Sequence, residues 1–255
     1  MTRSILILGG TADARILAGK LADKTGCRIL LSMAGRTREP VQQPVPMRTG
    51  GFGGASGLAE FITQHGFDLL VDATHPYASR ISPNARQAAQ QANIPLVALE
   101  RPAWERHPAD RWESVADVES AVVALGRHGT RAFLALGRQE LLPFEAAPHH
   151  DYLIRSVDPV EPPLNLPRAR YITARGPFTV EDELSLLSEK RITHIVSKNS
   201  GGAAAYAKIQ AARELGIIIV MIDRPVRGEG ATVPSIDAAL AAIDHQLSLF
   251  EERGE

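Results

Sequence analysis

The chain has 255 residues, 44% of them hydrophobic, which is enough for one large domain or two of modest size, each with an apolar core. Its 28 Lys and Arg residues nearly balance its 29 Asp and Glu residues, which argues against broad binding of nucleic acids or attraction to a membrane surface. A single cysteine, Cys27, excludes a disulfide or a cysteine metal site within one chain. The apolar run near the N-terminus is too short for a signal peptide and no stretch is as long as a membrane span, so we expect a soluble, cytoplasmic protein.

The first predicted elements are a strand at residues 5–8 and a helix at residues 12–21. The strand is short, apolar and rich in branched side chains, which is typical of a strand buried on both faces of a parallel sheet. Gly9 and Gly10 end it, and Thr11 can cap the helix. Such a turn suits anionic groups, because backbone N–H groups and the positive end of the helix dipole face the ligand. It matches the dinucleotide pattern Gly-x-Gly-x-x-Gly only in part, so an ordinary turn of another α/β protein is the alternative.

The rest of the first half alternates strands and helices around one long loop. The loop covers residues 34–54 and carries glycines, prolines and several arginines. We predict strands at residues 28–32, 68–72 and 95–99, and helices at residues 55–65 and 82–93. This alternation predicts a doubly wound parallel sheet.

The second half repeats the alternation after a polar, proline-containing crossover at residues 100–111. We predict strands at residues 112–115, 132–136, 152–156, 170–173, 194–197 and 217–222. Helices are predicted at residues 117–125, 180–189, 203–215 and 236–250. We therefore expect an α/β protein with mainly parallel sheets and two domains, at residues 1–100 and 101–255.

The end of the second strand bears on the choice of cofactor. NAD-binding folds usually carry Asp or Glu there, about 20 residues beyond the glycine turn, to hold the ribose 2′-hydroxyl. In this chain the strand ends in Ser32, and Arg36 and Arg38 follow. A hydroxyl and guanidinium groups suit a 2′-phosphate, so we predict NADPH. The alternative is a solvated loop that happens to be basic.

Basic residues follow four predicted strands of the second half, namely Arg138, Arg175, Lys198 and Arg224. Ligands of open α/β sheets bind outside the carboxyl ends of the strands, so these charges predict a polyanionic ligand. The loop after one strand precedes a helix and is a second candidate anion site, through Lys198, Asn199, Ser200 and Gly201. We expect at least one of the four cations to pair with a nearby carboxylate, such as Asp182, Glu183 or Asp223.

The histidines do not indicate a metal centre. His149 and His150 lie in a predicted loop, without a carboxylate or cysteine at the spacing of metal ligands, so we expect no bound metal.

Six short motifs occur along the chain in order: Leu8-Gly-Gly-Thr11, Gly50-Gly-Phe-Gly-Gly54, Asp72-Ala-Thr-His-Pro-Tyr77, Glu100-Arg-Pro-Ala-Trp104, Arg175-Gly-Pro-Phe-Thr179 and Ser197-Lys-Asn-Ser-Gly-Gly202. Together they resemble the precorrin-6A reductase family of cobalamin biosynthesis, over about residues 3–225. The resemblance implies two Rossmann-like domains with NADPH in the cleft between them. It also implies reduction of one double bond of precorrin-6A, a macrocycle with many acetate and propionate groups, to precorrin-6B.

The site residues that we predict fall into three groups. For the cofactor we expect contacts from Gly9, Gly10, Thr11, Ala12, Arg15, Ser32, Arg36, Arg38, Thr74, Pro76 and Tyr77. For the substrate we expect contacts from Arg138, Arg175, Lys198, Asn199, Ser200, Gly201 and Arg224. His75 is the candidate donor of the proton that accompanies the hydride, because histidine ordinarily titrates near neutral pH. A ring that only shapes the pocket, with the proton taken from solvent, is equally compatible with the sequence.

A non-enzymatic NADP-binding sensor or regulator is the alternative function. The four basic strand ends argue against it, because a sensor does not need them. Cobalt-containing and cobalt-free forms of the substrate are both compatible with these residues. We expect a monomer whose partner is a small polycarboxylate tetrapyrrole, and neither nucleic acid nor a membrane.

Overall fold

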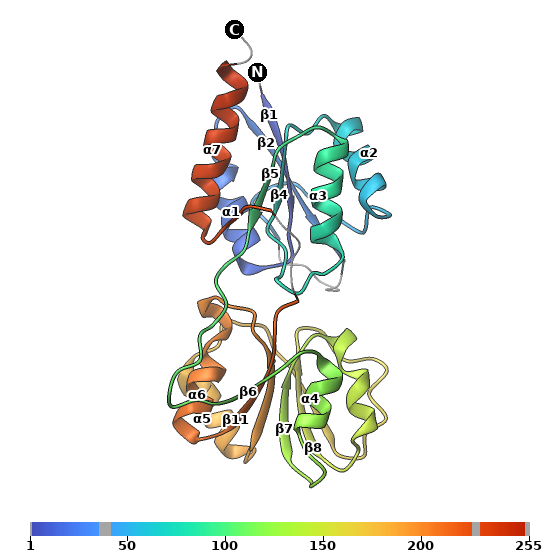
Figure 1. Cartoon of the computed structure of the whole chain (residues 1–255), viewed down its shortest axis with the longest axis vertical. Helices are drawn as coiled ribbons and strands as arrows, with labels where there is room; N and C mark the ends of the chain where they lie inside the picture. The colour runs from blue at the N-terminus through green and yellow to red at the C-terminus, as the bar shows by residue number, and fades with distance from the viewer. Residues whose placement is uncertain (1, 36–41, 226–229, 253–255) are drawn as a thin grey trace. The chain divides into compact units, whose positions relative to one another are not determined.

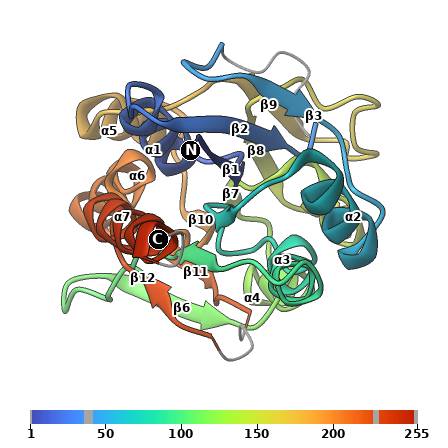
Figure 2. The ribbon, with the colours of Figure 1, turned by 90° about the horizontal axis from the view of Figure 1, so that it is seen from above.

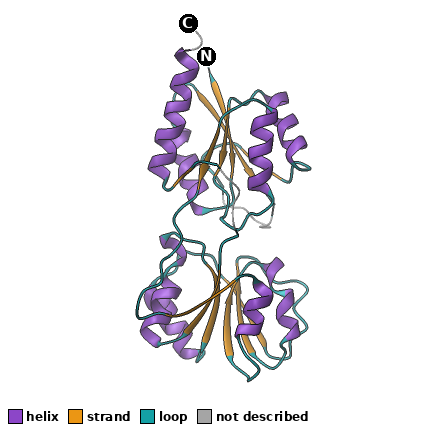
Figure 3. Cartoon of the chain, viewed as in Figure 1, coloured by secondary structure: helices purple, strands orange, loops and turns teal. Residues whose placement is uncertain are grey.

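The computed structural model describes residues 2–35, 42–225 and 230–252. The chain divides into two compact units, the first formed by residues 1–102 and 226–255 and the second by residues 103–225. Each unit holds a six-stranded sheet in which every strand pairing is parallel, with helices against both faces (Figures 1 and 3). The predicted α/β class with parallel sheets is therefore confirmed.

The sheet of the first unit has the strand order β12-β5-β4-β1-β2-β3. Its strands are β1 (Arg3–Leu8), β2 (Cys27–Met33), β3 (Met47–Thr49), β4 (Leu69–Asp72), β5 (Leu96–Leu99) and β12 (Thr232–Val233). Its helices are α1 (Ala12–Ala22), α2 (Ala55–His65), α3 (Ile81–Gln91) and α7 (Ile236–Glu252). Figure 2 shows α2 close to α3, and α7 beside β12.

The core of this unit lies on both faces of the sheet. Alternate residues of a strand point to opposite faces, so Ile5 and Ile7 of β1 pack with α1 and α7. Leu6 and Leu8 pack instead with α2 and α3. Because β1 is buried on both sides, its sequence is apolar at every one of these positions, which is why it could be recognised.

The C-terminal segment belongs to the first unit, which differs from the division expected at residue 100. In this segment β12 pairs with β5 of the first sheet. Ala239, Ile243 and Leu247 of α7 lie at helical spacing and are buried in the same core as β1. The apolar stripe of α7 is visible in the sequence, but the stripe does not say which of two similar sheets it covers.

The sheet of the second unit has the strand order β6-β11-β10-β7-β8-β9. Its strands are β6 (Arg111–Val115), β7 (Arg131–Ala135), β8 (Asp151–Ser156), β9 (Ala169–Thr173), β10 (His194–Lys198) and β11 (Ile218–Ile222). Its helices are α4 (Val118–Ala124), α5 (Val180–Glu189) and α6 (Ala207–Leu215), with short 3-10 turns η1 (Arg138–Glu140), η2 (Leu142–Ala146) and η3 (Ala203–Ala205). Helices α5 and α6 cover one face and α4 covers the other (Figure 1).

Two local features differ from the predicted elements. Strand β3 lies inside the segment that we expected to be a loop, and pairs with β2 over only three residues. The predicted helix at residues 203–215 is divided into η3 and α6, with Tyr206 between the two. Within the described part of the chain, none of the helices combines the length and apolar character needed to cross a membrane.

Candidate functional site

The glycine turn after β1 has the conformation that the sequence predicted. Thr11 caps α1, since its Oγ1 accepts a hydrogen bond from the Ala14 backbone N–H at 3.0 Å. The same hydroxyl donates to the Ala73 carbonyl at 2.8 Å, and so ties the turn to the end of β4. The Gly9 N–H donates to the Ser32 carbonyl at 2.9 Å, which places the end of β2 on the other side of the turn.

The two glycines of this turn have separate structural reasons. A Cβ at Gly9 would lie 2.7 Å from Leu31 Cδ1 and 3.3 Å from the Ala14 Cβ, so a larger residue would require the Leu31 side chain to shift. Gly10 has a φ of +111°, which favours glycine, and nothing lies within 4 Å of where its Cβ would be. Open space above a capped helix N-terminus fits a phosphate group. Ala12 opens α1, and the Arg15 side chain is exposed on it.

The loop after β4 is braced by the buried carboxylate of Asp72. Its Oδ1 accepts from the Thr74 N–H at 3.0 Å and from Thr74 Oγ1 at 2.6 Å. In His75, Nδ1 accepts from the Tyr77 N–H at 3.3 Å, and in the neutral ring this leaves the proton on Nε2. The His75 ring is half-buried and Pro76 is buried, and Thr74 Oγ1 also lies 3.3 Å from Ser82 Oγ at the start of α3.

Arg48 is a candidate cofactor-binding residue that is not among those predicted from the sequence. Strand β3 places it opposite Ser32, and its Nη1 donates to Ser32 Oγ at 2.8 Å. The guanidinium also donates to the carbonyls of Gly50 and Gly51 and lies 4.1 Å from the centre of the Phe52 ring. Partial burial lowers the pKa of Arg48, yet arginine stays charged in proteins. The predicted contacts Arg36 and Arg38 lie outside the described residues.

A carboxylate also stands at the N-terminus of α1. Asp13, in its first turn, accepts a hydrogen bond from Arg101 Nη1 at 2.6 Å. Both side chains are partly exposed, at 26% for Asp13 and 18% for Arg101. Arg101 therefore offsets the negative charge that Asp13 would otherwise present to an anion at the glycine turn.

In the second unit, the predicted basic residues at the carboxyl edge of the sheet make contacts with protein acceptors. Lys198 Nζ forms an ion pair with Glu140 Oε1. Arg138 lies 3.8 Å from an Asp158 carboxylate oxygen and donates to the Pro159 carbonyl at 3.3 Å. Two of the cations pair with carboxylates, but the partners are Glu140 and Asp158, which were not among the three that we expected. Glu183 pairs with Arg155.

Two other predicted cations are placed differently. Arg224 Nε donates to the Asn199 carbonyl at 2.8 Å, which ties the end of β11 to the loop after β10. Arg175 is exposed in the loop after β9. Lys198 is therefore linked to η1, the turn that contains Arg138, by its ion pair with Glu140. Arg224 is linked to the loop after β10 by its hydrogen bond to Asn199.

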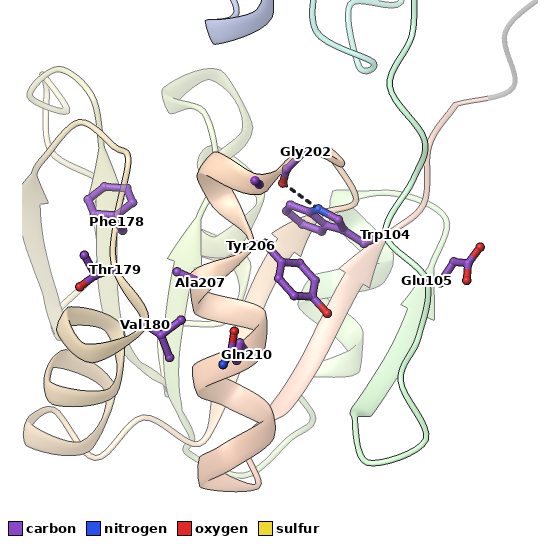
Figure 4. A pocket seen from close by; sticks show the side chains of 10 residues that line it. Trp104, Glu105, Phe178, Thr179, Val180, Gly202, Tyr206, Ala207 and Gln210 are labelled. Atoms are coloured by element: carbon purple, nitrogen blue, oxygen red, sulfur yellow. Dashed lines mark hydrogen bonds between the residues drawn. The ribbon is translucent and has the colours of Figure 1, made fainter. Parts of the chain in front are cut away.

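The loop after β10 is organised around Trp104. Asn199 Oδ1 accepts from the Trp104 N–H at 2.7 Å, and Asn199 Nδ2 donates to the Trp104 carbonyl at 3.0 Å. The indole Nε1 donates to the Gly202 carbonyl at 3.0 Å (Figure 4). Ser200 is 9% exposed, and Gly201 has a φ of +66°. We predicted that the Asn199 side chain contacts the substrate. In the structure both of its polar atoms form hydrogen bonds with the backbone of Trp104.

A pocket of about 680 Å³ opens between α5 and α6 (Figure 4). Its aromatic walls are Trp104, Phe178 and Tyr206. Three of the six motifs contribute to it, because Trp104 ends one, Phe178 lies in the second and Gly202 ends the third. The pocket therefore gathers segments that are far apart in the sequence.

Buried charges support these walls. Arg155 pairs with Glu183 at 2.6 Å and stacks 3.8 Å from the centre of the Phe178 ring. Lys208 Nζ donates to the Ala205 carbonyl at 2.7 Å and lies 5.1 Å from the Trp104 ring. Burial lowers the pKa of Lys208 to about 8, and the charge of Arg155 acts in the same direction. No sequence pattern distinguishes these residues from ordinary surface charges of α5, α6 and β8.

Comparison with known proteins identifies the chain. Two parallel α/β sheets, with a glycine turn at a helix N-terminus, define a protein of Rossmann-like architecture. The family described as Precorrin-6x reductase CbiJ/CobK matches residues 4–244, and the chain belongs to this family. The resemblance seen in the sequence is therefore confirmed.

Individual relatives agree over nearly the whole chain. A precorrin-6A reductase of Sinorhizobium sp is 54% identical over 96% of this chain and 94% of that protein. The solved structure of CobK precorrin-6A reductase matches with a TM-score of 0.92 and 46% identity, over 96% of this chain and 97% of that one. A cobalt-precorrin-6A reductase of Priestia megaterium is 30% identical, over 95% of this chain and 98% of that protein.

Proposed function

We propose that this chain is a reductase of cobalamin biosynthesis that converts precorrin-6A to precorrin-6B, with NADPH as the hydride donor. The observation that carries the proposal is membership of the precorrin-6x reductase family over residues 4–244, with 54% identity to a precorrin-6A reductase. Two features of the fold support the proposal: one unit has a glycine turn suited to phosphates, and the other has basic residues at a sheet edge.

The first unit offers the groups that NADPH would require. Its phosphates would be held by the backbone of Gly9, Gly10 and the capped first turn of α1, at Thr11 and Ala12. Ser32 and Arg48, joined at 2.8 Å, fit a 2′-phosphate at the end of β2. We retain Arg15, Arg36 and Arg38 as further contacts. When bound, NADPH supplies the hydride.

The loop after β4 is proposed to position the nicotinamide ring. Asp72 fixes Thr74, and Pro76 is buried, so the loop that carries His75 and Tyr77 is held in one conformation. A rigid loop lowers the entropy lost when a ring is oriented for reaction. The motif that contains these residues is the longest of those found in the first unit.

The second unit offers charges for the acetate and propionate groups of the macrocycle. Lys198 ends β10, Arg138 follows the neighbouring strand β7, and Arg175 and Arg224 follow β9 and β11. Charge-assisted hydrogen bonds to carboxylates are stronger than neutral ones, so several together hold a polyanion firmly. Asn199, Ser200 and Gly201 shape the loop that presents Lys198.

The chemistry adds one hydride and one proton across a carbon–carbon double bond. The hydride forms a C–H bond at one carbon of the double bond. The electron pair of the double bond then takes the proton at the other carbon. His75 is the proposed donor, through Nε2, since its Nδ1 accepts from the Tyr77 N–H. Solvent supplies the proton if His75 only forms a wall of the pocket.

We propose the cobalt-free substrate. Two similar proteins, at 54% and 46% identity, are named precorrin-6A reductases, whereas three relatives named for the cobalt form are 25% to 30% identical. The higher identity to the precorrin-6A reductases, over nearly the full length of the chain, favours precorrin-6A as the substrate.

The proposal is tested by following NADPH oxidation with precorrin-6A and cobalt-precorrin-6A in parallel. We expect faster oxidation with precorrin-6A and a product that carries deuterium on a ring carbon when deuterated NADPH is used. A product without the label would defeat hydride transfer. If NADPH binds but neither substrate is reduced, the protein is a sensor or regulator and the proposed activity is wrong.

A further inference from the structure

We propose that Glu140 is a specificity-determining residue. Its carboxylate forms an ion pair with Lys198 until a carboxylate of the substrate replaces it. This inference rests on the proposed function, because it assigns to Lys198 a polycarboxylate ligand. Glu140 belongs to no motif of the sequence analysis, and its role comes from its position in the structure.

The geometry places Glu140 beside Lys198 at the basic edge. It ends η1, the short turn that follows β7, and Lys198 ends the neighbouring strand β10. Glu140 Oε1 pairs with Lys198 Nζ, while Oε2 accepts a hydrogen bond from the Gly137 N–H at 3.0 Å. One oxygen therefore anchors the carboxylate to its own turn, and the other faces the lysine.

Exposure makes this pair replaceable. The side chains of Lys198 and Glu140 are 17% and 27% exposed, so a ligand can approach both. The Arg155–Glu183 pair in the same unit is different, at 9% and 1% exposed. Breaking a buried pair is costly because it leaves an uncompensated charge, and this cost is lower for a pair that lies nearer to solvent.

A tethered carboxylate also explains selectivity. Because Glu140 is held beside Lys198 at a high effective concentration, a dilute small anion competes poorly with it. A macrocycle that also reaches Arg138 binds at several points and displaces Glu140 more easily. Neutral substituents cannot take its place. The arrangement therefore favours ligands with several carboxylates at fixed spacing.

The test compares Glu140→Gln with Glu145→Gln. The first substitution keeps a side-chain oxygen for the Gly137 N–H but removes the charge that holds Lys198. Glu145 is a matched control, since it is also half-buried in a 3-10 turn and accepts from a backbone N–H, that of Asn165. Binding is measured as the quenching of tryptophan fluorescence by a porphyrin octacarboxylate, without NADPH, and KM and kcat are measured with precorrin-6A.

We expect Glu140→Gln to lower the Kd of the porphyrin, and the KM of precorrin-6A, by about two- to fivefold. The kcat should not change, and citrate should become a stronger competitor by a similar factor. Glu145→Gln should leave all of these values as in the parent protein. In a Lys198→Gln background, Glu140→Gln should have no effect, because its influence passes through Lys198.

An unchanged or raised porphyrin Kd in Glu140→Gln overturns the inference, as does an equal gain in the Lys198→Gln background. These results are separate from those that test the proposed function. If the porphyrin binds more tightly but precorrin-6A is not reduced, the polycarboxylate site stands and the proposed reaction fails. If precorrin-6A is reduced and Glu140→Gln changes neither constant, the reaction stands and the role of Glu140 is wrong.

Discussion

The Asn199 side chain holds the backbone of Trp104 at two points, with hydrogen bonds of 2.7 Å to its N–H and 3.0 Å to its carbonyl. Asn199 is 8% exposed, so both bonds form away from bulk water. This clamp fixes the segment that enters the second unit against the loop that carries Lys198.

Removing the clamp should therefore be costly. Asn199→Ala leaves two backbone groups of Trp104 without partners, which costs about 1–3 kcal/mol of unfolding free energy. We expect a lower midpoint in urea unfolding followed by tryptophan fluorescence. Asn165→Ala, at an exposed loop position, is the control and should unfold like the parent protein. Equal midpoints for the two variants would show that the clamp adds nothing.

Arg48 should set the choice between NADPH and NADH. Loss of a charge-assisted hydrogen bond to the 2′-phosphate costs about 1.5–3 kcal/mol, so Arg48→Ala should weaken NADPH by roughly ten- to a hundredfold. The affinity for NADH should hardly change. Calorimetric titration with both nucleotides measures this, and Arg28→Ala, at the opposite end of β2, is the control. We expect the same pattern for Arg36→Ala. Equal losses for both nucleotides would contradict the assignment.

His75 is tested through turnover. If it donates the proton, His75→Ala should lower kcat by about a hundredfold or more, with little change in NADPH affinity. Single-turnover measurements with precorrin-6A separate the chemical step from binding. A decrease of only a few-fold would leave His75 as a wall of the pocket, with the proton taken from solvent.

The buried Lys208 predicts a dependence of stability on pH. Its folded-state pKa is lowered to about 8, whereas an unfolded lysine titrates near its ordinary pKa of about 10.4. Between these values the unfolded chain binds more protons, so the Lys208 contribution to the unfolding free energy rises with pH. The unfolding free energy of the parent relative to Lys208→Met should rise, by up to roughly 3 kcal/mol, between pH 7.5 and 10.

Lys190→Met provides the control for this pH series, since Lys190 is partly exposed and pairs with its neighbour Glu189. Its unfolding free energy should follow that of the parent across the whole range. A Lys208→Met difference that is the same at every pH would show that Lys208 keeps an ordinary pKa in the folded protein.

The regular elements of both sheets could be predicted because burial leaves a pattern in the sequence. The continuous apolar run of β1 and the capping by Thr11 are both local signals. Strand β3 has no such signal, because it contributes only three residues and none of them is buried. Without β3 the sequence could not show that Arg48 stands opposite Ser32.

The partners of the site residues were harder to predict than the residues themselves. The sequence indicated a basic sheet edge, but Glu140 is 58 positions from Lys198 and meets it only because β7 and β10 are neighbours. Asn199 follows Lys198 directly, and the sequence predicts that both contact the substrate. The side-chain amide of Asn199 instead bonds to the backbone of Trp104. Adjacent residues at a strand end point in different directions, and this is decided by the fold.

The return of β12 and α7 to the first sheet affects how the protein is made. During translation the second unit, at residues 103–225, emerges complete before the last strand and helix of the first unit have been synthesised. Until then α1 alone covers the face of the first sheet that carries Ile5 and Ile7, and the part that α7 covers is exposed. The later part of the chain can therefore fold first on the ribosome, while the earlier part stays open to chaperones until its final helix arrives.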